Sequence, residues 1–324
     1  MKTINPRRIK GLLLFSALVL MVPILPLLAK TIPPGLVCIS TPAYAPARSF
    51  NPLPGRYSYT VSWNGIPAGS IELELDRQGD DYKIHASART AKGIDLVYKL
   101  RYESHAVLAA DTLKPKKSVS IVRANSREKT TELEFLPDGE IRSTRKNHHG
   151  KVKTIQFDSD NLTLDPYSAA FLALSQDWEV GQSRQFDLFN GKSRYLIEFT
   201  ALEKTELTIN EKRQAAIVLV PSIQKLNDTD DENEKKLRQA RIYISTGHPK
   251  KILKLSSDLL FGSVNAEMVG FTPFQNNTPP SMMDQEDTID RDKGKTPSMV
   301  IATNFLVPTA GVLSLYTLFQ TFYI

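Results

Sequence analysis

The sequence predicts a mainly β fold: a curved antiparallel sheet or partly open β-barrel that holds one central amphipathic helix. Short segments with alternating apolar and polar residues recur between residues 54 and 274, and tight-turn dipeptides separate them. A single segment has helical spacing instead. Of the 324 residues, 41% are apolar and 23% are charged, which is enough apolar residues for a packed core and excludes global disorder.

The clearest strand lies at residues 56–63, where Tyr57, Tyr59, Val61 and Trp63 alternate with polar residues. Asn64-Gly65 follows and is a strong two-residue turn signal. The same alternation continues through residues 71–76 and 82–88. Further strands are expected at 97–102, 119–121, 131–136, 141, 152–157, 195–199, 207–209, 217–219, 242–244, 253–255 and 264–268.

The helix is expected to begin after Asp165 as N-cap, with Pro166 in the first turn and Gly181 beyond its end. One face would carry apolar residues at offsets of three, four, seven and eleven: Tyr167, Ala170, Phe171, Leu174 and Trp178. Such a helix would pack across the sheet and fill its concave face or one end of the barrel. It could also act as a lid over a lipid cavity.

The chain divides by composition into five segments. We expect a signal peptide or membrane anchor at 1–29, a linker at 30–53, a β-rich periplasmic domain at 54–274, a disordered linker at 275–296 and a hydrophobic tail, possibly a membrane segment, at 297–324.

The N-terminal segment predicts the compartment. Residues 1–45 hold five of the 41 Lys and Arg and none of the 35 Asp and Glu, which leaves a net charge of +1 for the rest. An uncharged, Leu-rich run follows at 11–29. Ala43-Tyr44-Ala45 resembles a cleavage site, although Pro46 comes directly after it. Cleaved or retained, this segment predicts export to the periplasm of a Gram-negative bacterium, with the body free or anchored to the inner membrane.

Two further features concern the ends of the chain. Cys38 is the only cysteine, which excludes an intrachain disulfide, and Val37 before it fits a lipoprotein signal poorly. Residues 296–324 carry no charge, so they are either a second membrane anchor, a loose tail or terminal β-structure.

The motifs of common enzymes and metal sites are missing from the sequence. There is no Gly-x-Ser-x-Gly elbow or Gly-rich phosphate loop, and the histidines have neither His-Glu-x-x-His nor zinc-site spacing. His148-His149 is expected in an exposed turn and His85 on a solvent-facing strand position, whereas no role follows for His105 or His248. We therefore expect no enzymatic activity, no cofactor and no metal.

Charge clusters are interpreted as solvated surface. The acidic run at 228–234 lacks the glycine of a calcium loop and is expected to be a hairpin loop. Two basic stretches are expected on outer strand faces, with contact to anionic lipid as the alternative: Lys114, Lys116 and Lys117, and Arg142, Arg145, Lys146, Lys151 and Lys153. Neither has the aromatic interleaving of a nucleic-acid site, so we expect no nucleic-acid partner.

The order of motifs resembles one family. Residues 59–69 resemble its opening "Y-x-V-x-W-x-G-I-x-A-G" strand pair, and Asp165, Ser168 and Leu172 resemble its central "D-x-x-S-x-x-x-L" helix, with Gly181 after it. Residues 242–245, 249–252 and 261–264 resemble its closing strands. This is the exported bacterial family "domain of unknown function 3108", similar over about 55–271. The resemblance implies export but no catalytic residues, and residues 297–324 depart from its usual pattern.

Two functions follow as hypotheses. The first is a non-catalytic binding module for a lipid-like or apolar envelope molecule, enclosed by aromatic residues that could equally be plain core: Tyr57, Tyr59, Trp63, Phe171 and Trp178. The second is an envelope scaffold or assembly factor that binds another protein through a sheet edge. A solvent-connected cavity above roughly a few hundred Å³ would favour the first, and a filled core with an apolar surface patch the second.

Overall fold

The computed structural model describes residues 45–47, 50–159, 161–226, 240–259 and 262–274. The elements follow in chain order: β1 (Gly55–Trp63), β2 (Ile66–Gln78), β3 (Asp81–Thr90), α2 (Lys92–Asp95), β4 (Leu100–Ala109), β5 (Pro115–Ala124), β6 (Arg127–Phe135), β7 (Glu140–Lys146), β8 (Val152–Asp158), β9 (Thr163–Leu164), α3 (Pro166–Ser175), β10 (Ser183–Phe189), β11 (Arg194–Ile209), β12 (Lys212–Lys225), β13 (Ala240–Ser245), β14 (Ile252–Leu259) and β15 (Gly262–Pro273).

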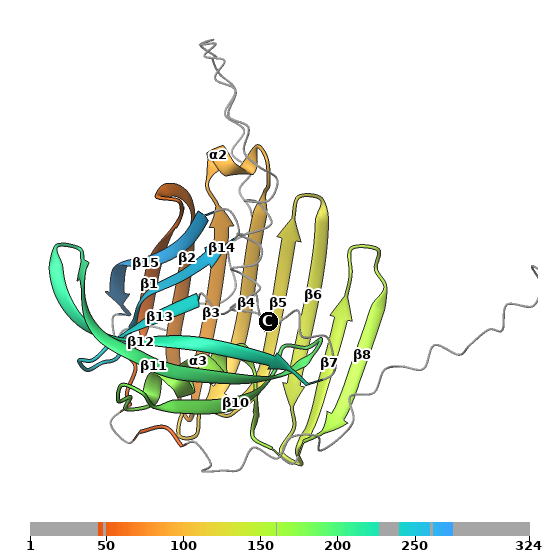
Figure 1. Ribbon diagram of the computed structural model, residues 1–324. Helices are drawn as coiled ribbons and strands as arrows, with labels where there is room; N and C mark the ends of the chain where they lie inside the picture. The colour runs from red at the N-terminus through yellow and green to blue at the C-terminus, as the bar shows by residue number, and fades with distance from the viewer. Residues whose placement is uncertain (1–44, 48–49, 160, 227–239, 260–261, 275–324) are drawn as a thin grey trace, which may run out of the picture. The chain divides into compact units, whose positions relative to one another are not determined.

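All fifteen strands belong to one sheet, in the order β8-β7-β6-β5-β4-β3-β2-β1-β15-β14-β13-β12-β11-β10-β9. The described chain therefore starts and finishes in the middle of the sheet, where β1 pairs with β15 (Figure 1). Neighbours are antiparallel except β9 and β10. The prediction of a mainly β, partly open antiparallel sheet with a central helix is confirmed.

The β1–β15 pairing divides the sheet into a first half, β1–β8, and a second half, β9–β15. Tight turns join several strands of the first half. Asn64 and Gly65 both have positive φ, 49° and 81°, as a type I′ turn between β1 and β2 requires. Asn64 Oδ1 also accepts a hydrogen bond from Ser263 N at 2.8 Å, which ties this turn to β15. Along β1 and β3 the buried residues alternate with more exposed ones, as the period of two predicts.

The β3–β4 connection differs from the prediction. Residues 92–95 form the short helix α2, and β4 begins at Leu100 and not at Val97. Asp95 fixes this connection, because Arg101 Nη2 donates to its Oδ2 at 2.6 Å and Thr90 Oγ1 to its Oδ1 at 2.5 Å. Leu96 and Val97 are left exposed.

The helix α3 begins where the sequence predicts. Asp165 caps it by accepting a hydrogen bond from Ser168 N at 2.7 Å, and Pro166 occupies the first turn. Eight of its ten residues are buried, so its apolar surface exceeds a single stripe. The helix ends at Ser175, and Trp178 therefore lies beyond it, with its indole N donating to Ala173 O at 2.8 Å.

A buried ion pair holds the crossover from β8 to α3. Asp187 and Arg194, 1% and 2% exposed, pair through several hydrogen bonds, including Arg194 Nε to Asp187 Oδ1 at 2.8 Å. Thr163 Oγ1 donates to Asp187 Oδ2 at 2.9 Å, and Arg194 Nη2 donates to Ser159 Oγ at 3.1 Å. The pair thus holds Ser159, which follows β8, and Thr163 of β9, which precedes α3.

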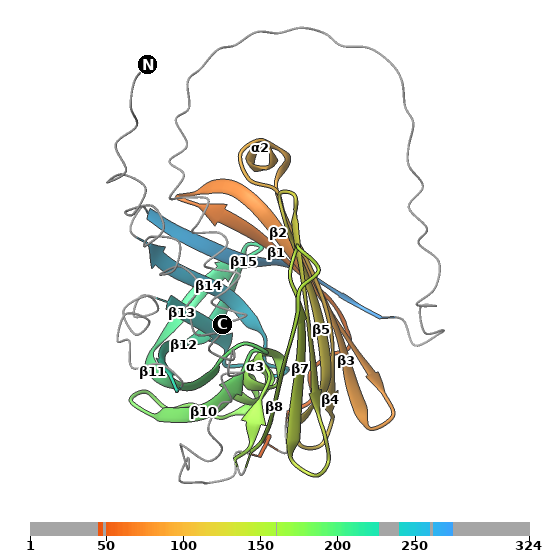
Figure 2. The same ribbon diagram turned by 90° about the vertical axis from the view of Figure 1, so that its right-hand side faces the viewer.

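Strands β10–β14 face the inner side of the first half, with α3 between them (Figure 2). The β10–β11 turn contacts β7 directly, because Ser143 Oγ donates to Gly191 O at 2.8 Å. The rings of Phe157 and Phe189 pack edge to face with centroids 5.1 Å apart. These contacts bend the sheet around one core.

Candidate functional site

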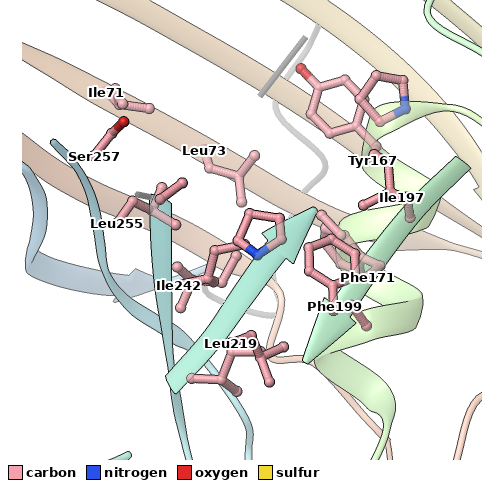
Figure 3. Close-up of a pocket in the computed structure, with 18 of the residues that line it drawn as sticks. Ile71, Leu73, Tyr167, Phe171, Ile197, Phe199, Leu219, Ile242, Leu255 and Ser257 are labelled. Carbon is pink, nitrogen blue, oxygen red and sulfur yellow. The ribbon is translucent and has the colours of Figure 1, made fainter. Parts of the chain in front are cut away.

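An apolar cavity of about 210 Å³ lies between the inner faces of the two halves, and it is partly open to solvent (Figure 3). Four lining residues are polar, Ser87, Arg241, Ser256 and Ser257, and the others are aliphatic or aromatic. The latter come from β1–β4 and from α3 and β10–β14: Tyr59, Ile71, Leu73, Ala86, Ala88, Tyr102, Pro166, Tyr167, Ala169, Ala170, Phe171, Ala173, Leu188, Ile197, Phe199, Leu219, Pro221, Ile223, Ala240, Ile242, Ile244, Ile252 and Leu255.

Small residues create the space. Ala86 and Ala88 of β3 lie on the inner face of the sheet, and Ala169, Ala170 and Ala173 lie on the opposing α3. Longer side chains at these positions would fill the gap between helix and sheet, since protein interiors are otherwise closely packed. An apolar cavity of roughly 150 Å³ already binds benzene, so this one can take a short hydrocarbon segment.

Two tyrosines border the cavity at one end. The hydroxyls of Tyr102 and Tyr167 lie 3.5 Å apart, and burial raises the pKa of both. These side chains therefore remain uncharged at physiological pH and present hydroxyl groups in a largely apolar wall. Tyr59, another lining residue, donates through its hydroxyl to Ile252 O at 3.1 Å.

A second, polar cleft of about 480 Å³ lies on the inner face of β4–β8. Six cationic side chains line it: Lys129, Arg145, Lys146, Lys151, Lys153 and Lys192. None of the described residues that line it is acidic. The remaining lining residues are Leu100, Tyr102, Ser120, Val122, Thr130, Thr131, Asn147, His148 and Asn190.

The two basic stretches of the sequence have different surroundings. Lys116, Lys117 and Arg142 pair with Asp81, Glu134 and Glu140, as a solvated outer face implies. The rest of the second stretch, after Arg142, departs from that interpretation, because Arg145, Lys146, Lys151 and Lys153 line the polar cleft. Lys129 and Lys192, which the sequence analysis missed, join them from β6 and from the β10–β11 turn.

Only two of the five aromatic residues that the sequence suggests could enclose a ligand line the apolar cavity. Tyr59 and Phe171 line the apolar cavity, whereas Tyr57, Trp63 and Trp178 do not. Tyr57 packs on Phe271, with ring centroids 4.7 Å apart, and donates to Leu53 O. Trp178 lies under the guanidinium of Arg184.

His85, Glu103 and His105 form a small cluster on β3 and β4 that the sequence analysis did not connect. One ligand atom from each lies within 4.8 Å of the others. The two imidazole rings are nearly parallel, 6° apart, with centroids separated by 4.5 Å. Their nitrogen lone pairs lie in these parallel planes and cannot meet at one ion, so the arrangement does not fit a metal unless a ring turns.

His148-His149 occupies the β7–β8 turn, exposed as expected, and Asn147 Oδ1 accepts from His149 N and Lys151 N at 3.0 Å. His148 lines the polar cleft, where desolvation and then the electrostatic effect of the neighbouring His149 lower its pKa. The acidic run at 228–234, Cys38, the N-terminal segment to residue 44 and the tail from residue 275 lie outside the described residues. Within the described part of the chain, no helix has the length and apolar character needed to cross a membrane.

The fold and its cavities define a class: an open, barrel-like β domain with an internal apolar cavity beside a basic cleft. The chain belongs to the family described as "Protein of unknown function (DUF3108)", whose model matches residues 58–269. A solved β-barrel-like protein of domain of unknown function DUF1849 from Brucella abortus is similar, with 12% identity and a TM-score of 0.47, over 68% of this chain and 98% of that one. No curated protein matched the sequence.

Proposed function

We propose that this protein is a non-catalytic binding module of the cell envelope that takes up a lipid-like or other apolar molecule. The apolar cavity carries the proposal, because it is bordered by 23 aliphatic or aromatic residues and is partly open to solvent. Its volume of about 210 Å³ lies below the few hundred Å³ that would favour a carrier of a whole lipid, so it fits one hydrocarbon segment and not a bulky ring system. The basic, Leu-rich N-terminal segment supports export, and the lack of common catalytic motifs supports a binding role.

A cavity-filling variant tests the proposal. Ala170→Phe places a large ring at a lining position of α3, whereas Ala215→Phe adds the same ring at an exposed position of β12 outside the cavity. The full chain should increase the fluorescence of N-phenyl-1-naphthylamine, an uncharged apolar probe. Ala170→Phe should reduce this increase and Ala215→Phe should not. Equal probe binding by all three proteins would contradict the proposal.

The proposed location has its own test. Osmotic-shock fractionation of the native bacterium should recover the protein in the periplasmic or membrane fraction. Recovery in the cytosol would contradict the export part of the proposal and leave the binding part intact.

A scaffold that binds another protein is the second candidate. The observation in its favour is the α2 connection, where Leu96 is 90% exposed and Val97 is 48% exposed beside it. The edge strand β8 is less suited to strand addition, because Lys153 and Asp158 place charge along it. Cross-linking in cells, lost on Leu96→Ser and Val97→Ser substitution, would favour this candidate.

A further inference from the structure

The apolar cavity and the polar cleft meet at Tyr102, which lines both. They also share one face of the sheet. Tyr102 is directly opposite Val122, and Val122 is opposite Lys129. The adjacent row of opposed residues is Ser104, Ser120, Thr131, Arg145 and Lys153. Because opposed residues point to the same side, these two rows change from apolar and hydroxylic residues on β4 and β5 to mainly cationic residues on β6–β8.

The cleft gathers positive charge. Six cationic side chains belong to its described lining, and no carboxylate does. A concave site lined by several cations favours a multiply charged oxyanion.

The cleft is also held in shape. Its far wall is the β10–β11 turn, which carries Asn190 and Lys192. The hydrogen bond from Ser143 to Gly191 O fixes this turn against β7. This hydrogen bond therefore helps to hold Lys192 across the cleft from the cations of β6–β8.

We propose that the ligand is an anionic amphiphile, with its hydrocarbon chain in the apolar cavity and a phosphate-type headgroup in the cationic cleft. This inference rests on the proposed function, and it adds the chemistry of the headgroup. The polar cleft of about 480 Å³ has room for such a headgroup beside the apolar cavity of about 210 Å³.

Three probes test the inference by calorimetry on the full chain, below their micelle concentrations. Dodecyl phosphate carries both parts, dodecyl glucoside carries the same chain without charge, and inorganic phosphate carries only the oxyanion. Dodecyl phosphate should bind at least roughly tenfold more tightly than either of the others, as several charge-assisted hydrogen bonds predict.

Matched charge variants locate the effect. Lys129→Gln, Lys151→Gln and Lys153→Gln together remove three charges from the cleft, and Lys114→Gln, Lys204→Gln and Lys212→Gln remove three exposed charges outside it. The first triple variant should lose the preference for dodecyl phosphate and bind dodecyl glucoside as before. The second should behave like the native chain.

Each other outcome overturns a defined part. Equal binding of dodecyl phosphate and dodecyl glucoside would overturn the headgroup site and leave the proposed function standing. Binding of inorganic phosphate as tight as that of dodecyl phosphate would mean a site for free phosphate and overturn the amphiphile. If both triple variants lose the preference for dodecyl phosphate equally, the preference comes from the net charge of the protein, and the headgroup site in the cleft is overturned. Binding of neither dodecyl compound would overturn the inference together with the proposed function.

Discussion

The hydroxyl of Ser143 on β7 donates a hydrogen bond of 2.8 Å to the carbonyl oxygen of Gly191 in the β10–β11 turn. The two residues are 48 positions apart and belong to opposite halves of the sheet. Both are buried. Their contact therefore closes the concave face at the end where the cationic cleft lies.

Substitution of Gly191 should destabilise the fold. Its backbone φ is +85°, a value that residues other than glycine rarely adopt. A Cβ added at this position would lie 2.5 Å from Thr131 Cγ2. Gly191→Ala should lower the free energy of unfolding by about 1–3 kcal/mol, measured by urea denaturation. Gly247→Ala is the control, because its Cβ would meet no atom within 4 Å. Equal stability of the two variants would contradict the proposed role of this turn.

The buried pair of Asp187 and Arg194 should show strong coupling. Asp187→Leu or Arg194→Met alone leaves one uncompensated charge in the core and should cost about 3–5 kcal/mol. The double variant removes both charges and should cost clearly less than the sum of the two. A double-mutant cycle in urea measures the coupling, and additive losses would show that the pair contributes little.

Asp95 should stabilise the protein only above acidic pH. The hydrogen bonds from Arg101 are the main cause that lowers its pKa to about 2, below the unfolded value near 3.9. Its contribution is therefore complete above pH ~4 and is lost as the pH falls toward 2. Asp95→Asn should cost about 1 kcal/mol at pH 7, because the pair is partly exposed, and less at pH 3. A pH-independent loss would contradict the ion-pair explanation.

Asp165 should have the opposite dependence. Burial raises the pKa of this N-cap carboxyl, so ionisation favours the unfolded chain. The free energy of unfolding should fall as the pH rises from about 3.9 through the higher folded pKa. Asp165→Asn keeps an oxygen for Ser168 N and should remove this slope, whereas Asp165→Ala should cost about 1 kcal/mol by loss of the cap. An unchanged slope in Asp165→Asn would contradict the assignment.

Much of the sheet could be predicted from local patterns. The alternation around Tyr57 and the Asn64-Gly65 turn identify β1 and β2, since strand period and turn type are local properties. The sequence predicts Trp178 on the helix because its offset fits a helical face, but the helix ends three residues earlier and the indole donates back to Ala173 O. The sequence also predicts Val97 in a strand, because an apolar residue in a connection has the same local pattern as one at a strand end, but β4 begins at Leu100.

The cationic cleft could not be predicted as a unit, because it combines five strands, β4–β8, with Lys192 from a distant turn. One signal was nevertheless present in the sequence. Lys129 and the buried Leu133 have the same parity on β6, so a lysine lies on the same face of the strand as a core residue. A charge at such a position marks either an edge of the core or a polar site.

The pairing of β1 with β15 has a consequence for synthesis. Tyr57 on β1 faces Phe271 in the register, more than two hundred residues later, so one edge of β1 has no partner until nearly the whole domain has been made. Any nascent or prematurely terminated chain that stops short of β15 exposes this edge, an open template for aggregation. The protein should therefore depend, more than a simple meander of equal length does, on factors that shield unpaired strands during translation.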